Sequence, residues 1–84
     1  MFKNNYIYSA EQFGQFLSTA RKERGYTQED FADIIGVSHA TLSALENGKP
    51  VSSATLFKAM QFLGYMIKLE PKSTSTINKE DLVK

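Results

Sequence analysis

The sequence predicts an all-α domain of four to five helices, and three observations support this. Apolar residues recur at helical spacing in four stretches between residues 9 and 64. Each stretch opens at a residue type that caps helix N-termini, namely Ser9, Thr27, Ser38 and Ser52. Each is followed by a glycine, the residue that most readily ends a helix. The alternation typical of a strand begins only after Gly64.

The predicted core follows from the same spacing. Helical periodicity places one apolar stripe of each helix toward the interior. The residues expected inside are Phe13, Phe16, Leu17 and Ala20 in the first helix, Phe31, Ala32, Ile34 and Ile35 in the second, Leu42 and Leu45 in the third, and Leu56, Ala59, Met60 and Leu63 in the fourth.

The composition excludes several classes of protein. The 84 residues contain no cysteine and one histidine, so we expect no disulfide, metal site or cofactor. No apolar run approaches the roughly 18 residues of a membrane helix, and residues 1–10 lack the apolar stretch of a secretory signal. We therefore expect a cytoplasmic protein with no membrane partner. The net charge is only +1, so any nucleic-acid binding must depend on a local arrangement of charges.

The segment after the fourth helix predicts a single strand, residues 65–70. Its candidate dimerisation residues are Tyr65, Met66, Ile67, Lys68 and Leu69. A lone strand leaves backbone groups unpaired, and the same strand of a second copy would pair them across a two-fold axis. The alternative is an extended segment that packs on the helices. We expect one domain over residues 1–84, with a core at 9–64 and a flexible, polar tail at 71–84.

The centre of the chain carries the motif that points to a function. Residues 27–49 are TQEDFADIIGVSHATLSALENGK, two short predicted helices joined by a tight turn at Gly36. Ala32 is small, so a second helix can approach closely there. Phe31, Leu42 and Leu45 fall where two crossed helices need core contacts. The pattern predicts a helix-turn-helix.

With these residues the sequence resembles the phage-repressor-like (Cro, XRE) helix-turn-helix family, which has a lambda-repressor-like fold. The matching residues are Arg21, Gly25-Tyr26-Thr27-Gln28, Phe31-Ala32, Gly36-Val37-Ser38 and Leu45-Glu46-Asn47-Gly48-Lys49-Pro50, and the resemblance covers about residues 9–64. Within this family the sequence is most similar to the HipB-type antitoxins. That similarity lies in Ile7-Tyr8-Ser9, in Ala40-Thr41-Leu42-Ser43 and in the strand at residues 65–70.

The resemblance implies that the third helix enters the major groove of DNA. With the apolar residues of this helix facing inward, its opposite face carries small or hydrogen-bonding side chains that can approach base edges. The predicted DNA-binding residues are Thr27, Gln28, Ser38, His39, Ala40, Thr41, Ser43, Asn47, Lys49 and Arg24. Of these, we expect Asn47, Lys49 and Arg24 to contact the phosphate backbone. In related repressors the pair equivalent to Arg21 and Glu46 forms a structural ion pair, and we expect the same here.

Each assignment has an alternative. The functional interpretation of His39 is a contact with a base or a phosphate. The alternative is that His39 is only an exposed residue of the first turn. Gln28 could simply cap its helix. Glu29, Asp30 and Asp33 could form a solvated face or a patch for a protein partner. The serines near His39 have no acid placed to orient the imidazole, so we expect no enzyme.

The resemblance implies a homodimeric repressor that binds double-stranded DNA at a near-palindromic operator. Half-sites would lie about one helical turn, roughly 34–36 Å, or a multiple of it apart. The similarity to HipB-type antitoxins further implies a type II toxin–antitoxin operon that the protein represses, and a HipA-like serine/threonine kinase toxin that it neutralises. One alternative is a stand-alone phage-like or metabolic repressor without a toxin partner. Another is a protein-binding module that has lost DNA binding.

Overall fold

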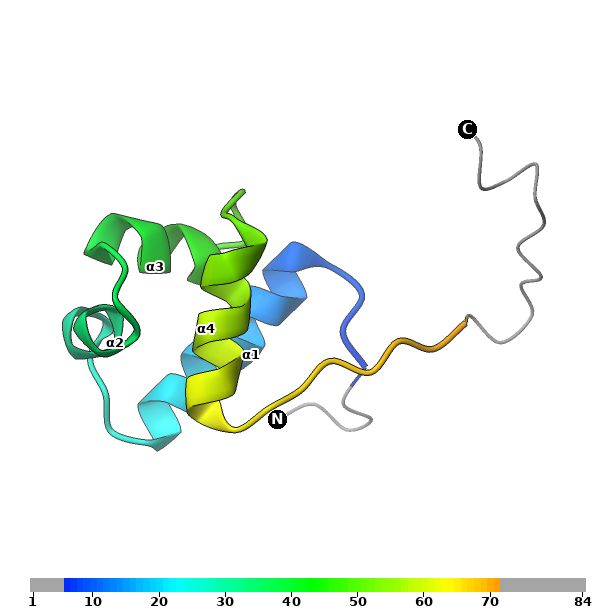
Figure 1. Ribbon diagram of the computed structural model, residues 1–84, viewed down its shortest axis with the longest axis horizontal. Helices are drawn as coiled ribbons and strands as arrows, with labels where there is room; N and C mark the ends of the chain where they lie inside the picture. Colours follow the sequence, from blue (N-terminus) through cyan, green and yellow to red (C-terminus); the bar gives the residue numbers. More distant parts are fainter. Residues whose placement is uncertain (1–5, 72–84) are drawn as a thin grey trace.

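The computed structural model describes residues 6–71 and contains four helices in that range (Figure 1). They are α1 (Ala10–Glu23), α2 (Gln28–Ile35), α3 (His39–Glu46) and α4 (Ser53–Leu63). The all-α prediction is thereby confirmed. Most of the predicted tail, residues 72–84, lies outside the described residues. No described helix is long and apolar enough to cross a membrane.

All four predicted N-caps are confirmed. Ser9, Thr27, Ser38 and Ser52 are extended, and the side-chain oxygen of each accepts a hydrogen bond from the backbone N–H three residues later. The helices end where glycines reach positive φ, as at Gly36 with φ 77°, a backbone conformation that other residues adopt only under strain. Local sequence therefore fixes the helix boundaries before any packing is considered.

The core lies where α1, α2, α3 and α4 meet. Leu17, Phe31 and Leu42 are its largest fully buried side chains, one from each of the first three helices, and Ala59 of α4 is buried as well. One predicted inward residue is wrong: Ile34 of α2 is 46% exposed. The apolar stripe of α2 passes through Phe31 and Ile35, and Ile34 lies one residue off that stripe.

Two glycines allow α1 and α3 to approach closely. A Cβ placed on Gly14 would lie 2.3 Å from the backbone oxygen of Glu46 and 2.8 Å from that of Leu45. A Cβ on Gly48 would lie 2.8 Å from the Cα of Glu11. Only hydrogen fits at these positions, so the end of α3 is seated directly on α1.

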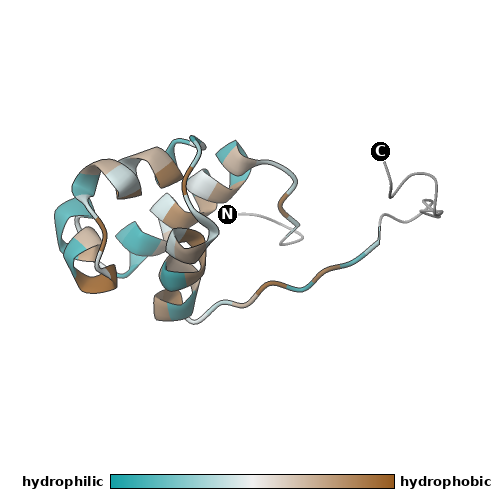
Figure 2. Ribbon diagram, turned by 45° about the horizontal axis from the view of Figure 1, so that its top comes forward, coloured by the Kyte–Doolittle hydropathy of each residue, from teal (hydrophilic) through white to brown (hydrophobic). Residues whose placement is uncertain are grey.

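The segment after α4 differs from the sequence prediction. Residues 65–70 leave the helices as an extended segment and not as a strand. Hydrophobic and hydrophilic residues alternate along it (Figure 2). A strand is defined by ladder hydrogen bonds, and residues 66–70 make no backbone hydrogen bond to another described residue. Pairing with a second copy of the chain stays a prediction.

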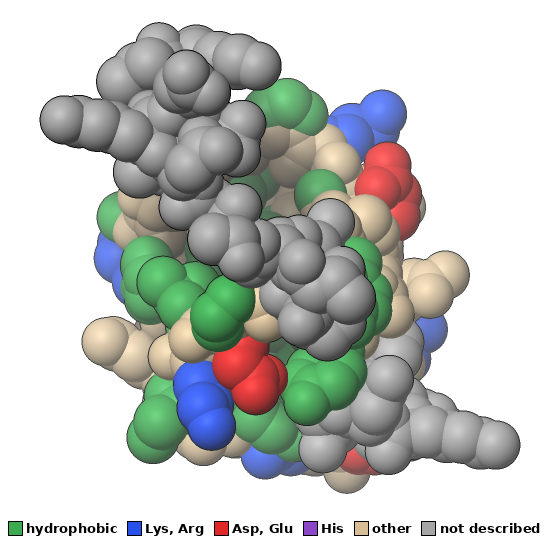
Figure 3. All heavy atoms as spheres, turned by 90° about the vertical axis from the view of Figure 1, so that its right-hand side faces the viewer, with side chains coloured by type: hydrophobic (Ala, Val, Ile, Leu, Met, Phe, Trp, Pro, Cys, Tyr) green, Lys and Arg blue, Asp and Glu red, His purple; other side chains and the backbone are tan. Residues whose placement is uncertain are grey.

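The extended segment is only partly attached to the helices. Tyr65 packs edge-on against Phe16 of α1, with ring centroids 4.9 Å apart. Beyond it, Met66 and Leu69 are 87% and 89% exposed. Figure 3 shows hydrophobic side chains on the face of the molecule from which this segment projects. The alternative of a segment that packs on the helices therefore holds for Tyr65, whereas Met66 and Leu69 are almost fully exposed.

Candidate nucleic-acid interface

Helix α3 has one buried side and one open side. Leu42 and Leu45 are buried against the core, 0% and 4% exposed, and they fix the rotation of the helix about its axis. The predicted residues of the opposite side lie at the surface: Ser38, His39 and Ala40 are exposed, whereas Thr41 and Ser43 are half-buried. The structure thus brings together five residues that the sequence assigns to DNA, on a helix narrow enough for a major groove.

The first turn of α3 determines how its hydroxyl groups can bond. Ser38 Oγ accepts from the backbone N–H of Thr41 at 3.0 Å and donates to Thr41 Oγ1 at 2.8 Å. Because the Ser38 proton is used internally, this residue has no hydroxyl proton left to donate. Thr41 accepts that bond, so its own proton is available for a base or a phosphate oxygen.

A buried ion pair joins α1 to the end of α3. Arg21 Nε donates to Glu46 Oε2 at 2.6 Å and Arg21 Nη2 donates to Glu46 Oε1 at 3.0 Å, with both side chains more than nine-tenths buried. Arg21 Nη1 donates in addition to the carbonyl of Tyr26 at 2.6 Å. The structure thus places Arg21 and Glu46 in the ion pair that the resemblance implies. The pair is bidentate, which is a strong and directional form of ion pair.

Gln28 connects this ion pair to the surface. Its Nε2 donates to Glu46 Oε1 at 2.9 Å, and its Oε1 lies 2.9 Å from Nε2 of His39. Gln28 is the first residue of α2, and His39 is the first residue of α3. The starts of the two helices are therefore joined by side chains. The N-cap of α2 is Thr27, so the alternative in which Gln28 only caps its helix is wrong.

The remaining candidates flank α3. Asn47 Nδ2 donates to the backbone oxygen of Ser43 at 2.8 Å, which ties it to the last turn of the helix. Lys49 is exposed two residues further on, with its charge free to reach a phosphate. Thr27 is exposed at the start of α2, where its oxygen accepts from the backbone N–H of Asp30.

Arg24 does not belong to this surface. Its Nη2 donates to the carbonyl of Leu63 at 2.9 Å, its Nη1 donates to the carbonyl of Ala20 at 3.3 Å, and its guanidinium carbon lies 5.8 Å from the ring centroid of Tyr65. These partners are at the C-terminal ends of α1 and α4, away from α3 (Figure 1). The phosphate contact expected for Arg24 is replaced by a structural role, because carbonyls near the C-terminal ends of two helices hold the guanidinium.

The electrostatics of α3 favour an anionic partner. Its only Asp, Glu, Lys or Arg residue is Glu46, which is buried and neutralised by Arg21. No acidic residue lies in its first turn, so the positive end of the helix dipole is unopposed there. A small local surface is thus suited to a polyanion although the net charge of the chain is only +1.

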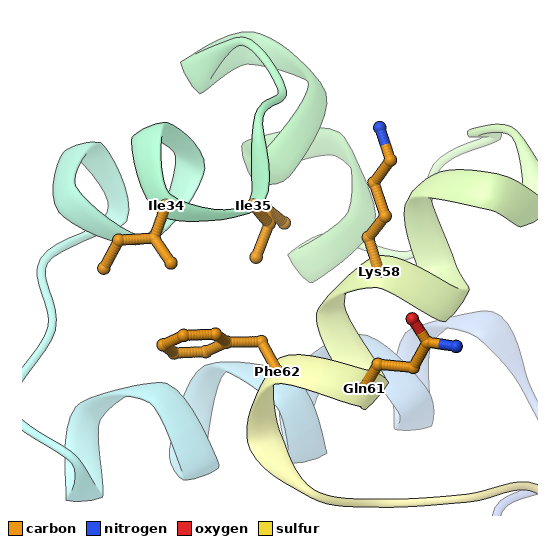
Figure 4. Close-up of a pocket in the computed structure, with 5 residues that line it drawn as sticks. All are labelled: Ile34, Ile35, Lys58, Gln61 and Phe62. Atoms are coloured by element: carbon orange, nitrogen blue, oxygen red, sulfur yellow. The ribbon is translucent and has the colours of Figure 1, made fainter.

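A separate shallow hollow lies between α2 and α4 (Figure 4). Ile34 and Ile35 point toward Phe62, whereas the side chain of Lys58 extends away from them and Gln61 lines the rim. The hollow is open to solvent and lined by a single charged group. Within residues 6–71 there is no group of three or more His, Cys, Asp or Glu side chains that could hold a metal ion.

Comparison with known proteins identifies the class. The family model described as helix-turn-helix matches residues 17–66, which include α2, α3 and α4. The chain is 33% identical over 81 residues to the antitoxin HipB of Escherichia coli K12, covering 88% of this chain and 92% of that protein. It is 39% identical over 49 residues, 58% of this chain and 71% of the relative, to the uncharacterized HTH-type transcriptional regulator YazB of Bacillus subtilis. The chain therefore belongs to the helix-turn-helix family, in the group that contains HipB.

Solved structures support the same grouping. The HipB-O4 20mer complex has a TM-score of 0.70 and 32% identity, over 83% of this chain and 97% of that one. The HipA-HipB-O2-O3 complex has a TM-score of 0.72 and 32% identity, over 86% of this chain and 100% of that one.

Sequence reasoning missed two contributors to this surface. Gly14 lies in the middle of α1 and allows the end of α3 to pack against it. The sequence feature that could have indicated this is a glycine inside a helical pattern, which is unfavourable for the helix and therefore needs a packing reason. The carbonyl of Tyr26 accepts the third hydrogen bond of Arg21. No side-chain pattern could have indicated that contact, because the acceptor is backbone.

Proposed function

We propose that this chain is a sequence-specific DNA-binding repressor that acts as the antitoxin of a type II toxin–antitoxin operon. It represses its own operon and neutralises a HipA-like serine/threonine kinase toxin. The observation that carries the DNA-binding part is the open side of α3, a carboxylate-free face of small and polar residues locked to α1 and α2 by the Arg21–Glu46–Gln28 contacts. The toxin-binding part rests on the similarity to HipB, a protein solved together with HipA.

The repressor acts as a homodimer. The exposed apolar residues Met66, Ile67 and Leu69 lie within residues 66–70, whose backbone groups make no hydrogen bond to another residue of the described range 6–71. A second copy supplies both the ladder and the apolar cover. Two copies present two α3 helices, which doubles the phosphate contacts and offsets the weak net charge. The operator is accordingly near-palindromic, and the role involves no catalysis.

The toxin-binding part is tested by co-expression. A HipA-like kinase gene is expected next to the gene for this chain. The tagged chain should copurify with that kinase and relieve the growth arrest that the kinase causes. Ala40→Glu is the matched control, since it blocks the groove face of α3 and leaves a toxin surface elsewhere intact. Relief by neither form would contradict the antitoxin role.

The alternative is a stand-alone transcriptional repressor, which the 39% identity to an HTH-type transcriptional regulator favours. It predicts that the promoter of the chain's own gene, or of a neighbouring metabolic or phage gene, is repressed in a cell that holds no HipA-like kinase. It also predicts that no kinase gene lies beside it. The neighbouring gene separates the two proposals, because an antitoxin is normally encoded next to its toxin, whereas repression of the upstream region is expected in both cases.

A further inference from the structure

A directed chain of hydrogen bonds runs from the buried ion pair to the exposed start of α3. Arginine carries donors only, so every bond of Arg21 to Glu46 points toward the carboxylate. The carboxylate of Glu46 is an acceptor, and its Oε1 takes a further hydrogen bond from Gln28. The direction of the chain is therefore set in the core, where both charged side chains are more than nine-tenths buried.

The carboxylate fixes the orientation of the Gln28 amide. Only the NH₂ end can face Glu46 Oε1, because the carbonyl end would set oxygen against carboxylate oxygen at 2.9 Å. With Nε2 on Glu46, the amide oxygen faces the other way, 2.9 Å from Nε2 of His39. Because Glu46 accepts from one end of the amide, the other end is fixed as an acceptor that faces His39 at the surface.

The amide oxygen in turn selects the tautomer of His39. An amide oxygen has no proton to give, so the bond exists only when His39 Nε2 carries the hydrogen. In a neutral imidazole the other nitrogen, Nδ1, then bears a lone pair and accepts. His39 is exposed, and Nδ1 makes no hydrogen bond to any residue in the described range 6–71.

We infer that His39 reads DNA as a hydrogen-bond acceptor through Nδ1 and selects a base that offers an exocyclic amine. In the major groove these amines are N6 of adenine and N4 of cytosine, whereas guanine N7 and O6 and thymine O4 are acceptors that repel the lone pair. Phosphate oxygens are acceptors too and therefore also repel the lone pair of Nδ1. In its neutral form His39 thus contacts a base and not the phosphate backbone. This inference rests on the proposed DNA binding and narrows it, since the sequence alone left His39 free to donate or to accept.

The tautomer is tested on the free protein. His39 is the only histidine, so a long-range ¹H–¹⁵N correlation spectrum of the labelled chain in alkaline buffer shows one imidazole. We expect a single Nε2-protonated form whose ring proton exchanges slowly with water. Gln28→Met, which has similar length and no hydrogen bond to offer, should give fast exchange and a mixture of tautomers. An Nδ1-protonated ring in the native chain would overturn the inference.

The base preference is tested by reversing the direction of the hydrogen bond between residue 28 and His39. Gln28→Lys replaces the amide by an ammonium group that donates both to Glu46 and to His39 Nε2, so Nδ1 must then carry the proton. The half-site position that His39 contacts is the one whose base preference disappears in His39→Ala, measured with every single-base variant of duplexes from upstream of the chain's own gene. Circular dichroism verifies that each variant is folded.

We expect the native chain to prefer adenine or cytosine at that position by roughly tenfold. Gln28→Lys should prefer guanine or thymine there, and Gln28→Met should discriminate little. The added charge of the lysine strengthens binding to all duplexes alike, so ratios between bases are unaffected. A native preference for guanine or thymine, or an unchanged preference in Gln28→Lys, would overturn the inference while DNA binding itself stands. If no duplex is bound specifically, the proposed function fails and base reading with it, and the spectrum still decides the tautomer.

Discussion

The contact between α1 and α3 can be tested with Gly14→Ala. We expect this substitution to lower the stability of the protein, although a change from glycine to alanine inside a helix usually raises it. Replacing a helix-interior glycine by alanine ordinarily stabilises a protein by about 0.5–1 kcal/mol. At Gly14 the added Cβ would lie 2.3 Å from the Glu46 backbone oxygen and 2.7 Å from its carbonyl carbon. An ordinary contact needs at least 3.4 Å, so the two helices must separate locally by about 1 Å.

The obstructing atoms are backbone, so no side-chain rotation relieves the contact. Overpacking of this kind costs about 1–3 kcal/mol, which exceeds the gain in helix propensity. Gly14→Ala should therefore lower the free energy of unfolding by about 1–2 kcal/mol and the melting temperature by roughly 5–15 °C. It should also weaken DNA binding, since α3 is displaced from the position in which Gln28 meets His39.

Thermal and urea unfolding followed by circular dichroism, at one fixed protein concentration, measure the effect. Gln15→Ala is the matched control, because Gln15 is exposed on the same helix and makes no such approach. The control should leave stability unchanged or slightly raised. A Gly14→Ala protein as stable as the native chain would refute the claim that the backbone at the end of α3 packs directly against Gly14.

Three further substitutions test other parts of the account. Arg21→Met leaves the Glu46 carboxylate buried without its cation and should cost about 3–5 kcal/mol of unfolding free energy in urea melts; a loss under 1 kcal/mol would show that the pair is not needed for the fold. Ala40→Glu should abolish specific DNA binding in anisotropy titrations with an unchanged melting temperature, because it puts a carboxylate in the groove; undiminished affinity would remove α3 from the interface. Ile67→Pro should yield monomers in light scattering, since proline removes a ladder donor, and a persistent dimer would place the interface elsewhere.

Local chemistry explains why so much of the fold could be predicted. The caps at Ser9, Thr27, Ser38 and Ser52 act within three residues, so sequence alone contains both partners. Ile34 and Ile35 were both predicted to be inside, because a short helix leaves the edge of its apolar stripe undefined; the structure buries Ile35 and leaves Ile34 exposed.

Long-range contacts explain what could not be predicted from the residues alone. Arg24 has the charge of a phosphate ligand, but Leu63 is 39 residues away in sequence, and only the packing of α1 beside α4 brings that carbonyl within reach. The contact between Gln28 and His39 depends on the angle between α2 and α3, which periodicity does not specify. The resemblance to related repressors anticipated the pairing of Arg21 with Glu46, and the structure adds the amide that extends it to the surface.

The central claim is that the open side of α3 recognises a specific DNA sequence, and fluorescence anisotropy tests it most directly. The native chain is titrated into labelled DNA from upstream of its own gene and into a scrambled duplex of the same composition, each at two salt concentrations. Tight binding to the upstream DNA alone, weakening steeply with salt, is the predicted result. Equal, weak binding to both duplexes would contradict it.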